Sequence, residues 1–244
     1  MMSLREVSLQ SAAFKQYIYK IKGYSNLVYG MFIAQALGLL FSMGGLMSRA
    51  FGRNNLSITV KSYSADLVIV FSLFWILITA ATIANKSYRN IEFSLVANRL
   101  SSNLSNMGFL MTFSIFAGIM ASLSGVLLRI LGYFIFGPAQ VLFEGFLISP
   151  INLLFGMFVT SLCLILFSAI GYLGGTLVEL HKSFVIIIPI LTAGFLKVYV
   201  QYLMKIYAYF FESSLPVFTL KLLALAILLF GISILLSNRL EVRK

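Results

Sequence analysis

Charged side chains are scarce in this sequence. They make up 10% of its 244 residues, and seven acidic residues stand against 18 lysines and arginines. The acidic residues lie outside the long apolar runs or near their ends, so no carboxylate pair is available for hydrolysis at membrane depth. A net charge of +11 would favour nucleic-acid binding in a soluble chain. Here the basic residues mostly flank apolar runs, where they contact membrane lipids and fix orientation, so we expect no nucleic-acid partner.

Cysteine and histidine occur once each. A single cysteine, Cys163, excludes a disulfide within one chain, and His181 cannot build a metal site alone. The sequence also contains no H-E-x-x-H motif, no Gly-x-Ser-x-Gly motif and no phosphate-binding Gly-x-x-x-x-Gly-Lys-Ser/Thr loop. We therefore expect this chain to be no enzyme and to bind no metal or cofactor itself.

Long apolar runs are what the sequence does have. Hydrophobic residues account for 60% of the chain, and its mean hydropathy is +0.99. Runs of about 20 apolar residues match an α-helix that crosses about 30 Å of hydrocarbon. They predict an all-α polytopic membrane protein with a single transmembrane domain over residues 1–244. We predict six transmembrane helices, at residues 24–48, 67–86, 107–129, 151–178, 183–199 and 217–237, with Pro189 kinking the fifth.

The segments outside these runs predict the topology. Residues 3–22 have the pattern of an N-terminal amphipathic helix lying in the membrane interface, and they lack the apolar core of a cleaved leader. Residues 49–66 form a hydrophilic connection. Six spans place both termini on one side, together with eleven of the 18 basic residues. The positive-inside rule therefore predicts a multi-pass protein of the cell (cytoplasmic) membrane with both termini in the cytoplasm.

Residues 86–107, KSYRNIEFSLVANRLSSNLSNM, interrupt the apolar pattern most strongly. At helical spacing Phe93, Val96, Leu100 and Leu104 share one face. A short amphipathic helix outside the bilayer can dock on a cytoplasmic partner, or it can lie on the lipid headgroups with its arginines near anionic lipid. The residues that we assign to docking are Tyr88, Arg89, Ile91, Glu92, Phe93, Val96, Arg99 and Leu100.

Small residues recur at every fourth position in two of the predicted spans. The first set is Gly30, Ala34 and Gly38, and the second is Gly171 and Gly175. This spacing gives a helix one smooth face, which lets another backbone approach closely. We expect both sets to lie in helix packing contacts, within the chain or between subunits.

Polar residues within or beside the spans suggest a substrate path. Gln35 is a lone polar group in the first span, where a helix–helix hydrogen bond is the commoner role. Lys197, Gln201 and Lys205 are four residues apart and share a helix face. They predict either a path for an amphipathic or anionic substrate or simply the solvated face of an interfacial helix.

The order of these elements resembles that of the membrane subunits of type-2 ABC exporters. Those proteins combine an N-terminal interfacial helix, six spans, a cytoplasmic coupling helix between spans two and three, and an outer segment like residues 199–216. The runs RNIE at 89–92 and NRLSS at 98–102 resemble the coupling region, and the final SNRLEVRK resembles the family's basic ending. The resemblance implies a homodimer, or a pair with a similar permease, bound to separate ATPase subunits that hold ATP and Mg²⁺.

The patterns and the resemblance together favour the permease subunit of an ATP-driven ABC exporter that moves a peptide, a drug-like molecule or another amphipathic substrate. Two alternatives stay open. Uncharged spans and Gln35 favour an ion-coupled secondary carrier. A membrane sensor or immunity protein would bind an antimicrobial peptide without transporting it.

Overall fold

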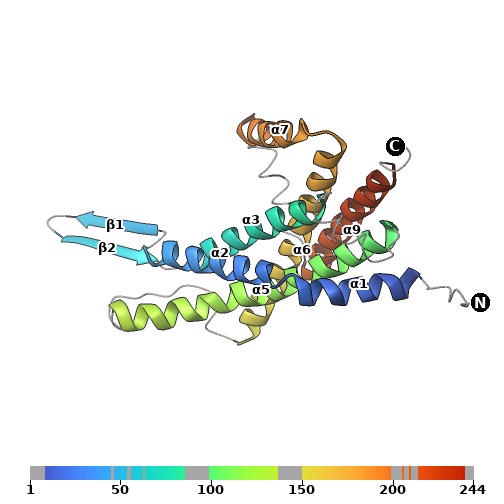
Figure 1. The fold of residues 1–244 in the computed structure, drawn as a ribbon. Coiled ribbons are helices and arrows are strands. Elements are labelled where there is room, and N and C mark those ends of the chain that lie inside the picture. The colour runs from blue at the N-terminus through green and yellow to red at the C-terminus, as the bar shows by residue number, and fades with distance from the viewer. Residues whose placement is uncertain are drawn as a thin grey trace, which may run out of the picture. The chain divides into compact units, whose positions relative to one another are not determined.

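Helices account for nearly all of the regular structure in the computed structural model (Figure 1). The structure describes residues 9–44, 47–53, 56–62, 64–85, 99–136, 150–198, 205, 209 and 214–239. A two-stranded hairpin, β1 (Met47–Arg53) and β2 (Leu56–Ser62), connects the second and third helices in the sequence. The helices are α1 (Leu9–Gly23), α2 (Ser25–Met43), α3 (Asp66–Ile83), α5 (Arg99–Phe136), α6 (Pro150–Leu180), α7 (Phe184–Val198) and α9 (Leu215–Arg239).

Five of these helices, α2, α3, α5, α6 and α9, are long and apolar enough to cross a membrane. They support the expectation of a helical multi-pass membrane protein. The predicted count of six spans is not confirmed. The helix α7 lies in the fifth predicted span and has 15 described residues, and residues 199–204 after it lie outside the described part of the chain.

The helix α5 is much longer than the span predicted at residues 107–129. It has 38 residues, which corresponds to about 57 Å of helix. Its first turns, RLSSNLSN, are polar, and residues up to Leu104 were predicted to belong to a separate amphipathic helix rather than to the span. In the structure the polar side chains of this stretch are buried: Ser101, Ser102, Asn103, Ser105 and Asn106. Leu104, which lies between them, is exposed. Because the rest of the protein encloses these side chains, the helix can continue through a polar stretch.

The connection predicted at residues 49–66 contains the antiparallel hairpin. Its register runs from the pair Met47 and Ser62 to the pair Arg53 and Leu56, so two asparagines separate the strands in the sequence. Adjacent asparagines suit a tight hairpin loop, and β2, LSITVKS, contains β-branched residues that favour a strand. Hydrophilicity alone predicted a loop here and missed both signals.

The chain divides into two compact units, which are described separately. Unit 1 comprises Met1–Ser25, Leu77–Phe113 and Ile165–Lys244. Unit 2 comprises Asn26–Ile76 and Ser114–Leu164. The long helices α3, α5 and α6 each contribute one part to each unit.

Unit 1 has a core built from the buried face of α9. Phe218, Leu222, Ala226 and Phe230 recur every fourth residue and are each at most 5% exposed. The ring of Phe230 lies 6.0 Å from that of Tyr172 on α6, centroid to centroid. This packing brings the buried Tyr172 hydroxyl into the interior of the unit.

Unit 2 is held by close contacts among its helices. A Cβ atom at Gly118 of α5 would lie 2.7 Å from the Cα of Ser161 on α6, so only a glycine fits there. The rings of Phe41 on α2 and Phe71 on α3 stack with centroids 5.8 Å apart. Small residues and aromatic contacts therefore set the helix spacing in this unit.

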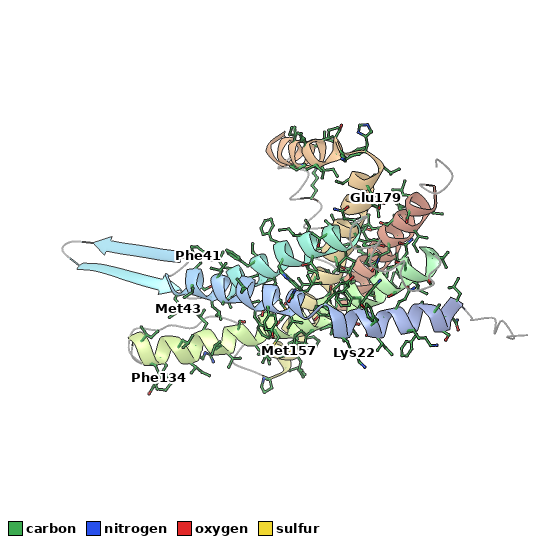
Figure 2. The ribbon with its side chains drawn as sticks, in the orientation of Figure 1. Lys22, Phe41, Met43, Phe134, Met157 and Glu179 are labelled. Atoms are coloured by element: carbon green, nitrogen blue, oxygen red, sulfur yellow. The ribbon has the colours of Figure 1, made fainter. Side chains whose placement is uncertain are left out.

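The single histidine, His181, lies in the turn between α6 and α7 and takes part in its hydrogen bonds. The backbone N–H of Phe184 donates to the carbonyl oxygen of His181 at 3.0 Å. The N–H of Ser183 donates to Nδ1 of the same imidazole at 3.4 Å. His181 therefore acts as a turn residue after Glu179, which Figure 2 labels in the last turn of α6.

A candidate polar site around Lys20

A buried lysine organises the polar interior of unit 1. Lys20 on α1 is 1% exposed, and it is the only charged residue among the buried side chains of the described chain. Its Nζ donates a hydrogen bond of 2.5 Å to Oδ1 of Asn106 on α5. Nδ2 of Asn106 donates to the hydroxyl oxygen of Tyr172 on α6 at 3.3 Å, and that hydroxyl donates to Oδ1 of Asn103 at 2.9 Å. Four side chains from three helices thus form one hydrogen-bonded network.

The helix α1 turns its polar face toward the protein. Its buried residues, Ala13, Gln16 and Lys20, are spaced three and four positions apart and share one face. Phe14 is 61% exposed on another face. Lys22, labelled in Figure 2, is also exposed. The apolar side chains of α1 are therefore exposed, and its place in the membrane interface stays a prediction.

Further contacts fix α1 along α5. The hydroxyl of Tyr17 and Oγ1 of Thr112 are 2.9 Å apart. A Cβ atom at Gly108 would lie 3.5 Å from the ring of Tyr17, and the ring of Tyr24 meets that of Phe109 edge-on at 5.7 Å. These contacts involve residues from Tyr17 to Tyr24 on one side and from Asn106 to Thr112 on α5, so they fix the two segments against each other.

The network retains unused hydrogen-bonding capacity. Oε1 of Gln16, Nδ2 of Asn103 and Oγ of Ser105 are buried and have no partner among the described residues. Each such atom costs about 1–3 kcal/mol. The described residues also contain no group of three or more histidine, cysteine, aspartate or glutamate side chains that could hold a metal. Among the described residues, this site therefore offers one lysine amine and several hydrogen-bonding side chains.

The sequence prediction overlooked this site. It counted Lys20 among the basic residues that flank the spans and assigned no role to Asn106 or Tyr172. The available signal was the spacing of Gln16 and Lys20 on one face of a helix whose apolar residues lie elsewhere. The partners could not be identified, because Asn106 is 86 positions away in the sequence.

The residues assigned to partner docking lie mostly outside the described residues: Tyr88, Arg89, Ile91, Glu92, Phe93 and Val96. Arg99 begins α5. Leu100 and Leu104 follow on its surface, 38% and 45% exposed. The described end of the predicted apolar face is therefore accessible.

The predicted small-residue faces lie against α3 of the same chain. A Cβ atom at Gly38 would be 2.7 Å from the Cα of Val68, and one at Gly30 would be 3.2 Å from Nε1 of Trp75. Ala34, between them, is half-buried. On α6, a Cβ atom at Gly175 would be 2.5 Å from the carbonyl oxygen of Ala81, and Gly171 meets the carbonyl oxygen of Leu77 still more closely.

Gln35 forms helix–helix hydrogen bonds in unit 2. It is 4% exposed. Its Nε2 donates to Oγ of Ser72 on α3 at 3.2 Å and to the carbonyl oxygen of Ala117 on α5 at 3.1 Å. One side chain therefore joins three helices.

The other predicted path residues are only partly described. Lys197 lies near the end of α7, Gln201 falls outside the described residues, and Lys205 is exposed. Nζ of Lys221 donates to the carbonyl oxygen of Tyr209 at 2.7 Å and lies 3.6 Å from the centre of its ring. These contacts suit a lysine at an interface and do not define a path.

No protein-family model matches this chain, and no curated protein or solved structure is similar to it.

Proposed function

We propose that this chain is the permease subunit of an ATP-driven exporter, and that the segment from Tyr88 to Leu104 docks on a separate ATPase. The first turns of α5 carry the proposal. Leu100 and Leu104 are exposed there, whereas the polar side chains of Asn103 and Asn106 are buried. A helix start that buries amides and exposes leucines, N-terminal to the span expected at residues 107–129, has a surface suited to a protein partner.

The anchoring of α5 supports a coupling role. The helix continues unbroken from Arg99 into the apolar stretch that can cross the membrane. The network joins it to α1 through Lys20 and to α6 through Tyr172. A partner that displaces this docking segment would therefore move three helices together. Motion of an ATPase could reach the membrane part of α5 through this connection.

The remaining features of the proposal follow from the exporter class. The chain would act in the cytoplasmic membrane with both termini inside, as a homodimer or paired with a similar permease. ATP and Mg²⁺ would be bound by the ATPase alone. The substrate would be a peptide, a drug-like molecule or another amphipathic compound.

Substitution of Phe93 tests the docking role. Burial of a phenylalanine side chain contributes about 1.5–3 kcal/mol, so Phe93→Asp should weaken ATPase association by roughly 10- to 150-fold. Leu100→Asp should act in the same direction. Ser94→Asp is the matched control, because it adds the same charge beside the apolar face. Co-purification from native membranes measures association, and substrate efflux measures transport.

A normal ATPase complex and normal efflux in Phe93→Asp would exclude docking through this face. If the segment lies on lipid headgroups instead, Phe93→Asp will loosen its membrane contact without changing any protein complex.

The buried Lys20 favours a second candidate, an ion-coupled carrier. Ionisable residues buried in membrane proteins often belong to ion or proton pathways. Collapse of all ion gradients distinguishes the two functions. Efflux that continues with ATP present would exclude the carrier. Efflux that stops after collapse, and is also lost in Lys20→Met, would favour it.

A further inference from the structure

A groove of about 380 Å³ lies between α2 and α5 in unit 2. Phe32, Ala36 and Leu39 line it from α2, and Met120, Leu123 and Leu127 line it from α5. Both helices belong to the group that can cross a membrane. The groove is open on one side, so a molecule dissolved in the bilayer can enter it.

Gln35 brings a hydrogen-bond acceptor to this apolar lining. Its two bonds, to Ser72 and to the carbonyl oxygen of Ala117, both start from Nε2 and use both amide hydrogens. The orientation of the amide is fixed, because a backbone carbonyl can only accept. Oε1 receives no hydrogen bond from any described residue and is not fully enclosed by protein. Oε1 is therefore the atom of Gln35 that can accept a hydrogen bond from a molecule in the groove.

The other polar residue of the groove offers no spare donor. Oγ of Ser124 donates to the carbonyl oxygen of Met120 at 2.9 Å. The described lining therefore presents apolar surface and hydrogen-bond acceptors. A ligand that fits must supply the hydrogen itself.

Gln35 lies near the middle of the apolar stretch of α2, which strengthens the requirement for a hydrogen-bond donor on the ligand. The apolar stretch of α2 runs from Asn26 to Met43 over 18 residues. Gln35 lies nine residues after Asn26, about 14 Å along a stretch of about 27 Å. Near the middle of a bilayer there is no water to donate to Oε1, so a donor carried by a ligand has little competition.

We propose that this groove binds a lipid-soluble molecule whose apolar body carries one hydroxyl group, which donates to Oε1 of Gln35. The apolar body packs against Phe32 and Leu39 on one side and Leu123 on the other. A plain acyl chain could fill the groove but would leave Oε1 unpaired. A second copy of the chain is the alternative occupant, and the experiment below separates the two. This proposal does not depend on an ATPase partner.

A pair of photoreactive probes tests the proposal on the full-length protein in phospholipid nanodiscs. One probe is a long-chain alcohol with a diazirine in its chain, and the other is its methyl ether, which has no donor. We expect the alcohol to label the groove residues roughly three- to tenfold more than the ether, as one hydrogen bond implies. Peptide mapping by mass spectrometry locates the labels.

Two variants of α2 separate the groove from the rest of the helix. Ala36→Phe fills the groove without altering the bonds from Gln35 to Ser72 and Ala117, so alcohol labelling should fall to the ether level. Ile33→Phe adds the same ring at a position that is 61% exposed and does not line the groove, so labelling should not change. Gln35→Met should make the two probes equivalent, with thermal unfolding measured for every variant.

Three results would overturn the proposal. Equal labelling by alcohol and ether in the unmodified protein would show a site for any acyl chain. Undiminished alcohol labelling in Ala36→Phe would place the probe elsewhere. Loss of dimer cross-linking in Ala36→Phe, with no preference for the alcohol, would identify a second copy as the occupant. None of these results bears on ATPase docking, which Phe93→Asp tests separately.

Discussion

Lys20 and Lys22 lie two positions apart on α1 in opposite environments. Lys20 is 1% exposed and bonded to Asn106, whereas Lys22 is exposed. Two residues correspond to about 200° around a helix, so the two side chains cannot share a face. Angular position relative to α5, and not charge, decides which lysine is buried.

Replacement of each lysine by methionine should therefore have different effects. Lys20→Met keeps the length of the side chain but leaves Oδ1 of Asn106 buried without its donor, which should cost about 1–3 kcal/mol of unfolding free energy. Lys22→Met should change that free energy by less than about 0.5 kcal/mol. Thermal or denaturant unfolding in detergent measures both. Equal stability of the two variants would mean that the Lys20 bond contributes nothing.

The sequence pattern predicted the role of Gln35 but not that of Lys20. The glutamine at position 35 was expected to form a helix–helix bond, because an amide within an apolar run needs a partner, and it bonds to Ser72 and Ala117. Lys20 was not identified, because the pattern around it equally suits a lysine that reaches headgroups. Only the bond to Asn106, 86 positions away in the sequence, distinguishes a buried lysine from one that reaches the headgroups.

Within α6, three neighbouring glycines differ in their surroundings. A Cβ atom at Gly175 would lie 2.5 Å from the carbonyl oxygen of Ala81, and Gly171 is equally close-packed against Leu77. A Cβ atom at Gly174 would meet nothing within 4 Å. The close approach of α3 and α6 therefore depends on the first two positions alone.

Alanine substitutions at these glycines should separate packing from helix propensity. Gly171→Ala and Gly175→Ala should destabilise the protein by about 1–3 kcal/mol, because the backbones must move apart. Gly174→Ala should be neutral or stabilising by up to about 1 kcal/mol, because alanine favours a helix. Unfolding midpoints in detergent provide the comparison. A loss in Gly174→Ala as large as in Gly175→Ala would argue against backbone contact.

Elements defined by an uninterrupted apolar run were predictable from the sequence, and elements that depend on specific contacts within the protein were not. The fourth predicted span, residues 151–178, nearly coincides with α6, Pro150–Leu180, because an uninterrupted apolar run defines both. The polar start of α5 was predicted as the end of a separate amphipathic helix, because its continuity with the apolar stretch depends on burial against α1 and α6. The hairpin was missed because its pairing, rather than its hydropathy, defines it.

For the whole molecule, α7 determines the topology. If it crosses the membrane, six spans place both termini on one side. If its 15 residues do not cross, the C-terminus lies opposite His181 after α9. The charge distribution favours six spans, and five of the described helices are long and apolar enough to cross.

Cysteine labelling in a Cys163→Ala background tests the topology. We expect an impermeant reagent added outside intact cells to label Arg53→Cys and to spare Asn98→Cys and His181→Cys, as the positive-inside rule implies. Lys244→Cys should also be protected. External labelling of Lys244→Cys together with Arg53→Cys would show that α7 does not cross, and labelling of Asn98→Cys but not Arg53→Cys would invert the orientation.

The bond between Lys20 and Asn106 also has a consequence for synthesis in the cell. The two residues are 86 positions apart, and a ribosome adds about 5–20 residues per second. Lys20 therefore emerges about 4–17 s before its partner exists, and Tyr172 is made later still. During that interval the polar face of α1 must be hydrated or shielded by the insertion machinery. The helix that is made first can take its final place only after α5 and much of α6 have been inserted.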